Sequence, residues 1–124
     1  MVSAPASNEP IAAVIQREMS TAARDGKTVI VTVGAEWCEP CQRFHEAVEA
    51  GALDEAFPNA RFVEFDLDRD LDRLKAAGYS SLMIPLFSIP GADGRDQGRR
   101  HMGAVKGAGA VDFIVTRLKA LLAQ

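Results

Sequence analysis

Cys38 and Cys41 are the only cysteines in the chain of 124 residues, and they stand three positions apart. A disulfide between them would close too short a loop to act as a structural staple, so their value must lie in their reactivity. Two buried thiols that serve as small apolar residues are the plainer alternative, which the polar neighbours Glu36, Glu39 and Gln42 disfavour. The pair therefore indicates thiol–disulfide exchange, in which a thiolate attacks a disulfide and a second thiol completes the reaction.

The segments around the cysteines predict how the two thiols are placed. A run of β-branched residues predicts a buried strand over 27–33, closed by Gly34, and a helix is expected to begin at or near Cys38 and to end around Gly51. A cysteine at a helix start lies near unpartnered N–H groups and the positive end of the dipole, which favours its thiolate. We therefore expect Cys38 to attack, and Cys41, one turn further in, to resolve the mixed disulfide.

The same segment resembles a known active site. The run Ala35-Glu36-Trp37-Cys38-Glu39-Pro40-Cys41, after an apolar strand, is similar to the active-site segment of the thioredoxin family. Tyr79, the pair Ile84-Pro85 before an apolar strand and Met102-Gly103-Ala104 before the last helix resemble further landmarks of that family, in the family's order. The resemblance covers the chain from about Thr28 to Leu122, and only the Trp-Cys-x-Pro-Cys element is specific by itself.

The resemblance implies a function and a set of site residues. It implies that the dithiol exchanges with disulfides of client proteins, favours the reducing direction, is recycled by an upstream thiol reductant, and needs no other cofactor. It also implies a monomer and a cis peptide bond before Pro85. The residues expected to form an apolar groove for the client's extended peptide, with Glu39 on the rim, are Trp37, Glu39, Pro40, Ile84, Pro85, Gly103 and Ala104.

The chain departs from the family pattern beneath the resolving cysteine. The family's buried acid lies six positions before the attacking cysteine, where this chain has Thr32, and the family's lysine on the neighbouring strand corresponds to Glu64. Our hypothesis is that Glu64, across the two central strands from Thr32, takes the proton of Cys41 directly or through water. The alternative is a Glu64 that only faces solvent at a strand end.

Glu39 replaces the glycine that is common between the two cysteines. Its charge should disfavour the Cys38 thiolate, but an exposed charge contributes about 1 kcal/mol or less, so the helix start should dominate. A Glu-Pro pair also occurs in thioredoxin-like reductases that serve cytochrome maturation outside the cytoplasm. The expected location is therefore cytoplasmic if the chain is complete, and periplasmic or otherwise extracytoplasmic if a signal or anchor has been removed.

A metal site is the rival chemistry. His45 lies four residues after Cys41 and seven after Cys38, so the three side chains could share one helical face. They would then form a redox-switched or zinc-loaded binding module that does not turn over. Zinc sites usually take four ligands, or three with water, and no fourth candidate is near in sequence. We therefore expect no metal, His45 as a partly exposed helix residue, and the second histidine, His101, at the surface.

The rest of the chain predicts an α/β, thioredoxin-like fold. The strand–helix–strand portion implies a parallel strand pair and the later hairpin an antiparallel one, so we expect a mixed four-stranded sheet with helices on both faces. Residues 1–8 are expected to be a flexible lead-in and 9–124 a single domain. The expected helices cover 9–23, 38–51, 69–77 and 110–122, and the expected strands 27–33, 61–68, 84–89 and 99–105.

Composition excludes several kinds of partner. With 48% hydrophobic residues, 25% charged residues and a net charge of -3, the chain has no general attraction for nucleic acid. Its basic cluster, Arg95, Arg99, Arg100 and His101, is offset by Asp93 and Asp96. No apolar stretch reaches the roughly 18 residues that a membrane-spanning helix needs.

Overall fold

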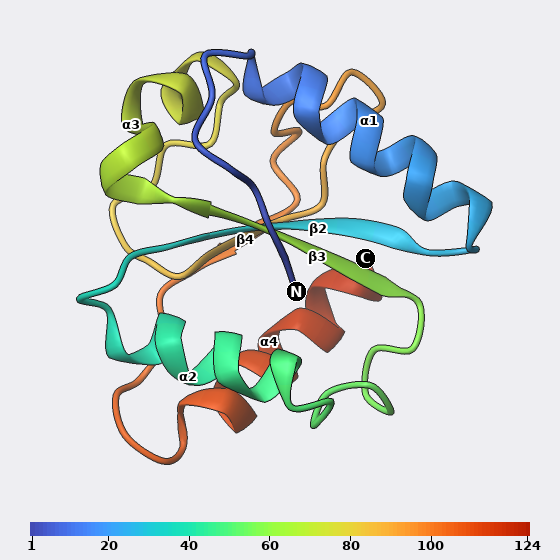
Figure 1. The fold of residues 1–124 in the computed structure, drawn as a ribbon. Helices are drawn as coiled ribbons and strands as arrows, with labels where there is room; N and C mark the ends of the chain where they lie inside the picture. The colour runs from blue at the N-terminus through green and yellow to red at the C-terminus, as the bar shows by residue number, and fades with distance from the viewer.

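A five-stranded mixed sheet runs through the middle of the molecule, with α1 and α3 on one face and α2 and α4 on the other (Figure 1). The computed structural model describes residues 1–124. The strand order is β1-β3-β2-β4-β5, in which β1, β3 and β2 are parallel, whereas β4 and β5 each run antiparallel to their neighbours. The elements are β1 (Val2–Ser3), α1 (Ile11–Arg24), β2 (Thr28–Gly34), α2 (Glu39–Glu49), β3 (Ala60–Asp66), α3 (Leu67–Ala76), β4 (Leu86–Ser88), β5 (Arg100–Met102) and α4 (Ala110–Leu122).

The first strand corrects the expected four-stranded sheet, and it lies within the segment 1–8 that was expected to be a flexible lead-in. Val2 and Ser3 pair with Val63 and Glu64 of β3, and the Ala4 N–H donates to the Glu64 carbonyl at 2.9 Å. This pairing satisfies backbone groups on what would otherwise be the open edge of β3. A strand of two residues is too short to show an alternating pattern, which is why the sequence did not reveal it.

Several element ends also differ from the expected ones. The Asp66 side chain accepts a hydrogen bond from the Arg69 N–H at 2.9 Å, so β3 ends at Asp66 and α3 begins at Leu67, two residues earlier than expected. The hairpin strands β4 and β5 are shorter than the expected 84–89 and 99–105. The last helix spans 110–122 as expected.

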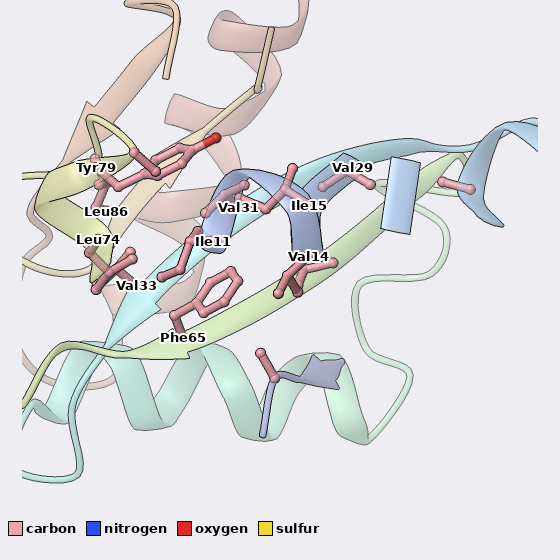
Figure 2. Packing of buried hydrophobic residues seen from close by; sticks show 14 residues of the cluster. Ile11, Val14, Ile15, Val29, Val31, Val33, Phe65, Leu74, Tyr79 and Leu86 are labelled. Carbon is pink, nitrogen blue, oxygen red and sulfur yellow. The ribbon is translucent and has the colours of Figure 1, made fainter. Parts of the chain in front are cut away.

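Alternating side chains of β2 and β3 build two separate cores. Val29, Val31 and Val33 of β2 pack beneath α1 with residues of α3, β3 and β4, as Figure 2 shows for Ile11, Ile15, Phe65 and Leu74 among others. Ile30 faces the opposite way, toward α2 and α4. Because strand side chains alternate between faces, Thr32 also faces α2, and so does Glu64, which is the register partner of Thr32.

Tyr79 lies at the end of the first core. Its hydroxyl donates to the Gly94 carbonyl at 2.7 Å, and burial raises the pKa of the Tyr79 phenol. Gly94 sits directly against α1, since an added Cβ there would lie 2.2 Å from the Ala12 carbonyl oxygen. The tyrosine therefore holds the 90–98 turn where Gly94 packs against α1.

Candidate active site

The two cysteines lie at the first turn of α2 and are joined by a disulfide. Cys38 is the N-cap residue of the helix, and its sulfur accepts a hydrogen bond from the Cys41 N–H at 3.4 Å. Pro40 occupies the first turn, where the N–H that it lacks would have no helical partner. The Ala35 carbonyl accepts hydrogen bonds from the Cys38 N–H at 3.1 Å and from the Gln42 side chain at 3.0 Å. The expected helix start at Cys38 is confirmed.

The two sulfurs differ in access. Both residues are largely buried, with 6% of Cys38 and 4% of Cys41 exposed, but only Cys38 lines the neighbouring groove. Cys41 lies behind it, against Gly34 at the end of β2. A partner in the groove would therefore meet the Cys38 sulfur first.

The groove has a volume of about 370 Å³ and an apolar lining. Its lining includes six of the seven residues expected for client binding, and Pro85 is the exception. The Ile84–Pro85 peptide bond is cis, and the Pro85 carbonyl accepts a hydrogen bond from the Gly103 N–H at 2.9 Å. The lining consists of Trp37, Cys38, Glu39, Pro40, Leu67, Ser81, Leu82, Met83, Ile84, Gly103, Ala104 and Lys106.

Two groove residues that sequence reasoning missed are Leu82 and Met83. Leu82 is 96% exposed, and Met83 lies against Gly103, whose added Cβ would be 3.3 Å from the Met83 Cε. Gly103 has a φ of 85°, which favours glycine, so a side chain here would be both strained and crowded. The available signal was an apolar Leu-Met pair in a loop directly before Ile84-Pro85, where polar residues are the norm.

Trp37 forms the exposed rim of the groove. Its indole N–H donates to the Asp68 carboxylate at 2.8 Å, and Asp68 lies in the first turn of α3. This hydrogen bond joins the cysteine turn to α3 and fixes the indole beside Cys38. The sequence did not indicate this hydrogen bond, because α2 and β3 separate the two residues along the chain.

Glu39 bridges the cysteine turn to the loop before α4. Its carboxylate accepts hydrogen bonds from the Gly107 N–H at 2.6 Å and from the Arg43 side chain at 3.1 Å. The Gly107 hydrogen bond, and then that of Arg43, lower the pKa of the Glu39 carboxyl. The negative charge that we expected near Cys38 is thus present, but it is directed to these partners.

Glu64 lies on β3, directly beside Thr32 of β2 in the strand register. The expected pairing of Glu64 with Thr32 is confirmed. Thr32 is buried, and its hydroxyl has no hydrogen-bond partner. Oε1 of the Glu64 carboxylate lies in hydrogen-bond contact with His45 Nδ1, at 3.0 Å. The Glu64 side chain is only 21% exposed. Glu64 therefore faces α2 instead of extending into solvent.

His45, the histidine of the metal hypothesis, contacts two carboxylates. His45 turns toward Glu64, with its Nε2 3.7 Å from the Glu49 carboxylate, while the two sulfurs are bonded to each other. No group of three or more metal-ligating side chains comes together. His101, expected at the surface, is half-buried and bonded through Nε2 to the Gly103 carbonyl at 3.0 Å.

Several solved structures that are similar to this one are thioredoxins. A poplar thioredoxin h is 28% identical, with 87% of each chain covered and a TM-score of 0.57. The chain has a thioredoxin-like fold. The thioredoxin of Trichomonas vaginalis is 24% identical over 97% of this chain and 92% of that one, with a TM-score of 0.60. That of Fasciola hepatica is 23% identical over 94% and 98%, with a TM-score of 0.58. No family model and no curated protein matches the sequence.

With a disulfide-forming Cys-x-x-Cys pair in this fold, the thioredoxin-like protein is a thiol–disulfide oxidoreductase. Its chemistry is carried by the dithiol and disulfide forms of Cys38 and Cys41. None of its helices combines the length and the apolar character needed to cross a bilayer.

Proposed function

We propose that this thioredoxin-like protein reduces disulfides of client proteins, with Cys38 as the attacking thiol and Cys41 as the resolving thiol. The observation that carries the proposal is the position of Cys38. It is the N-cap of α2 and the only cysteine that lines the apolar groove. The helix N-terminus stabilises a sulfur anion there, and the groove brings a client disulfide to it.

The first step is attack on the client. The Cys38 thiolate donates an electron pair to one client sulfur, a mixed disulfide forms, and the client S–S bond breaks, which releases the other client sulfur as a thiolate. The Cys41 N–H, 3.4 Å from the Cys38 sulfur, is a hydrogen-bond donor placed at the anion before attack. The groove walls, with Trp37 at the rim, hold the client chain beside this sulfur.

The second step is release of the client. Cys41 loses its proton, and its sulfur attacks Cys38, so the Cys38–Cys41 bond forms while the second client sulfur leaves as a thiolate. Two electrons have then passed from the dithiol to the client, and an upstream thiol reductant restores the dithiol. Glu64 is the carboxylate best placed to take the Cys41 proton, because its Oε2 and the Cys41 sulfur both lie within about 4 Å of the Cβ position at Gly34.

The groove supports an extended peptide as the bound form of the client. Apolar side chains of the lining, such as Pro40 and Ile84, can contact side chains of such a segment. We place Glu39, Gly103 and Ala104 among the contacts, with Pro85 acting from its position directly before β4. The protein acts as a monomer in this proposal.

Insulin reduction tests the enzyme against the alternative of a redox-switched or zinc-loaded module. With dithiothreitol as the recycling reductant, the protein should turn over insulin many times, and Cys38→Ser should abolish this turnover. Glu46→Gln, which changes an exposed charge on the same helix, serves as the control and should retain activity. Stoichiometric zinc binding without turnover would instead support the module.

The reduction potential tests the direction. The reduction potential of a thioredoxin that acts as a reductant is about -270 mV, whereas that of a strong oxidant with this fold is about -120 mV. We expect equilibration with glutathione to place the Cys38–Cys41 couple nearer the reducing value. A potential near the oxidising value would reverse the proposed direction while leaving the exchange chemistry intact.

A further inference from the structure

His45 and Glu64 form a pair directly behind the resolving cysteine. His45 lies one helical turn after Cys41 on α2, and its Nδ1 is 3.0 Å from Glu64 Oε1. No other side chain hydrogen-bonds to the Glu64 carboxylate. Both side chains are mostly covered, with 29% of His45 and 21% of Glu64 exposed. The pair is therefore a defined contact between α2 and β3, made where the protein core meets solvent.

The second carboxylate oxygen of Glu64 and the Cys41 sulfur both lie beside Gly34. A Cβ built on Gly34 would lie 4.0 Å from Glu64 Oε2 and 3.4 Å from the Cys41 sulfur. The Cys41 sulfur and Glu64 Oε2 are therefore no further apart than the sum of these two distances. One or two water molecules can bridge such a gap. A polar hollow of about 220 Å³, lined by Gly34, His45 and Glu64 among others, opens beside them. A proton leaving Cys41 can reach Oε2 and then solvent.

Other charged groups near the pair do not replace His45. Glu36, Asp66 and Arg69 line the same hollow, and Glu49 lies 3.7 Å from His45 Nε2. The Arg69 guanidinium is held by Asp70 at 2.7 Å and by the Ala4 carbonyl at 2.8 Å. His45 is therefore the group whose charge acts most directly on Glu64.

From this geometry, and resting on the proposed function, we propose that His45 is a positioning residue that makes the resolving step depend on pH. Neutral His45 donates its Nδ1 proton to Oε1, which leaves Oε2 free to accept the proton of Cys41. The electron pair left on Cys41 forms the bond to Cys38, and the client sulfur departs with the pair of the broken bond. Protonated His45 places a positive charge beside Glu64, which makes the carboxylate a weaker base and slows this step.

The test separates the two steps in a single turnover. Reduced protein is mixed with a slight excess of Ellman's reagent, an aromatic disulfide whose released thiolate absorbs visible light. The first release reports attack by Cys38, and the second reports attack by Cys41 on the mixed disulfide. Rates are measured in the range where histidine changes charge, between about pH 5 and pH 8.

Two variants of His45 give opposite expectations. His45→Asn keeps a neutral N–H near the Nδ1 position, so its second release should match wild type near pH 8 and exceed it by at least about threefold near pH 5. His45→Lys keeps a charge throughout, so its second release should match wild type near pH 5 and be slower by at least about threefold near pH 8. The first release should change little in either variant, and the control Glu46→Gln should follow wild type throughout.

The outcomes distinguish this inference from the function on which it rests. Profiles for His45→Asn and His45→Lys that run parallel to wild type would overturn the role of His45. If Glu64→Gln slows the second release at the same time, the base function of Glu64 stands without His45. Absence of a second release in the wild-type protein would overturn the proposed reductase mechanism itself.

Discussion

Replacing Gly34 with alanine would place a methyl group between Cys41 and Glu64. The new carbon would lie 3.1 Å from Cys41 Cβ and 3.4 Å from its sulfur, whereas carbon atoms normally approach to about 3.5–4.0 Å. Cys41 Cβ is attached to the backbone of α2, so the first turn of the helix would have to move by several tenths of an ångström.

The expected cost follows from two opposing effects. Overpacking a dense site lowers the free energy of unfolding by about 1–3 kcal/mol. Alanine also restricts the unfolded chain more than glycine does, which raises the free energy of unfolding by about 0.4–1 kcal/mol. We therefore expect Gly34→Ala to lower the free energy of unfolding by about 1–2 kcal/mol, which corresponds to a fall in Tm of about 3–8 °C for a chain of this size. The methyl group would also block the path from Cys41 to Glu64, so the second release from Ellman's reagent should slow by roughly tenfold.

Urea denaturation of the oxidised protein measures the first effect. Gly109→Ala is the matched control, because an added Cβ at Gly109 would meet no atom within 4 Å. Its free energy of unfolding should not fall, and the stiffer unfolded chain should raise it by up to about 1 kcal/mol. Equal stability of Gly34→Ala and Gly109→Ala, with unchanged release rates, would refute the placement of Gly34 between Cys41 and Glu64.

Three further substitutions test other parts of the molecule. Burial favours a raised pKa for the Asp70 carboxyl, but the hydrogen bonds and charge of Arg69, together with the charge of Arg73 and a backbone hydrogen bond, outweigh it, so the pKa is lowered. Asp70→Asn should therefore lower the free energy of unfolding by about 2 kcal/mol at neutral pH. This difference should shrink as the pH falls through the folded-state pKa, because the wild-type carboxylate is then protonated as well. Urea denaturation at neutral and at acid pH measures both values. Leu82→Ser should raise the KM for insulin by about fivefold, because an exposed apolar contact worth roughly 1 kcal/mol is lost, and should leave the first release from Ellman's reagent unchanged. Glu39→Gln should raise the alkylation rate of Cys38 at neutral pH by no more than about fivefold, since an exposed charge is removed, and a lower rate would contradict this.

The fold was predictable where periodic patterns are long. The last helix has an amphipathic pattern over several turns, and its expected range of 110–122 matches the structure. The N-terminal strand has only Val2 and Ser3, so its existence depends on the open edge of β3 and not on any local pattern. The start of α3 depends on the N-cap Asp66, which is also the last residue of β3. An aspartate at this position does not by itself show where the strand ends and the helix begins.

The site was predictable where neighbouring residues carry the chemistry. Cys38 and its helix start follow from a short continuous segment, as does the position of Cys41 one turn inside. Leu82 is part of the groove only because the loop leaves it exposed, which depends on tertiary structure. The contact of His45 with Glu64 depends on both the strand register and the rotation of α2, neither of which is fixed by counting residues.

Trapping the mixed disulfide tests the central claim most directly. Reduced Cys41→Ser and Cys38→Ser proteins are each mixed with a peptide that contains one disulfide, and the products are identified by mass spectrometry. We predict that Cys41→Ser accumulates a covalent adduct through Cys38, because attack proceeds and release cannot, while Cys38→Ser forms almost none. An adduct that accumulates equally in Cys38→Ser would contradict the assignment of Cys38 as the attacking thiol.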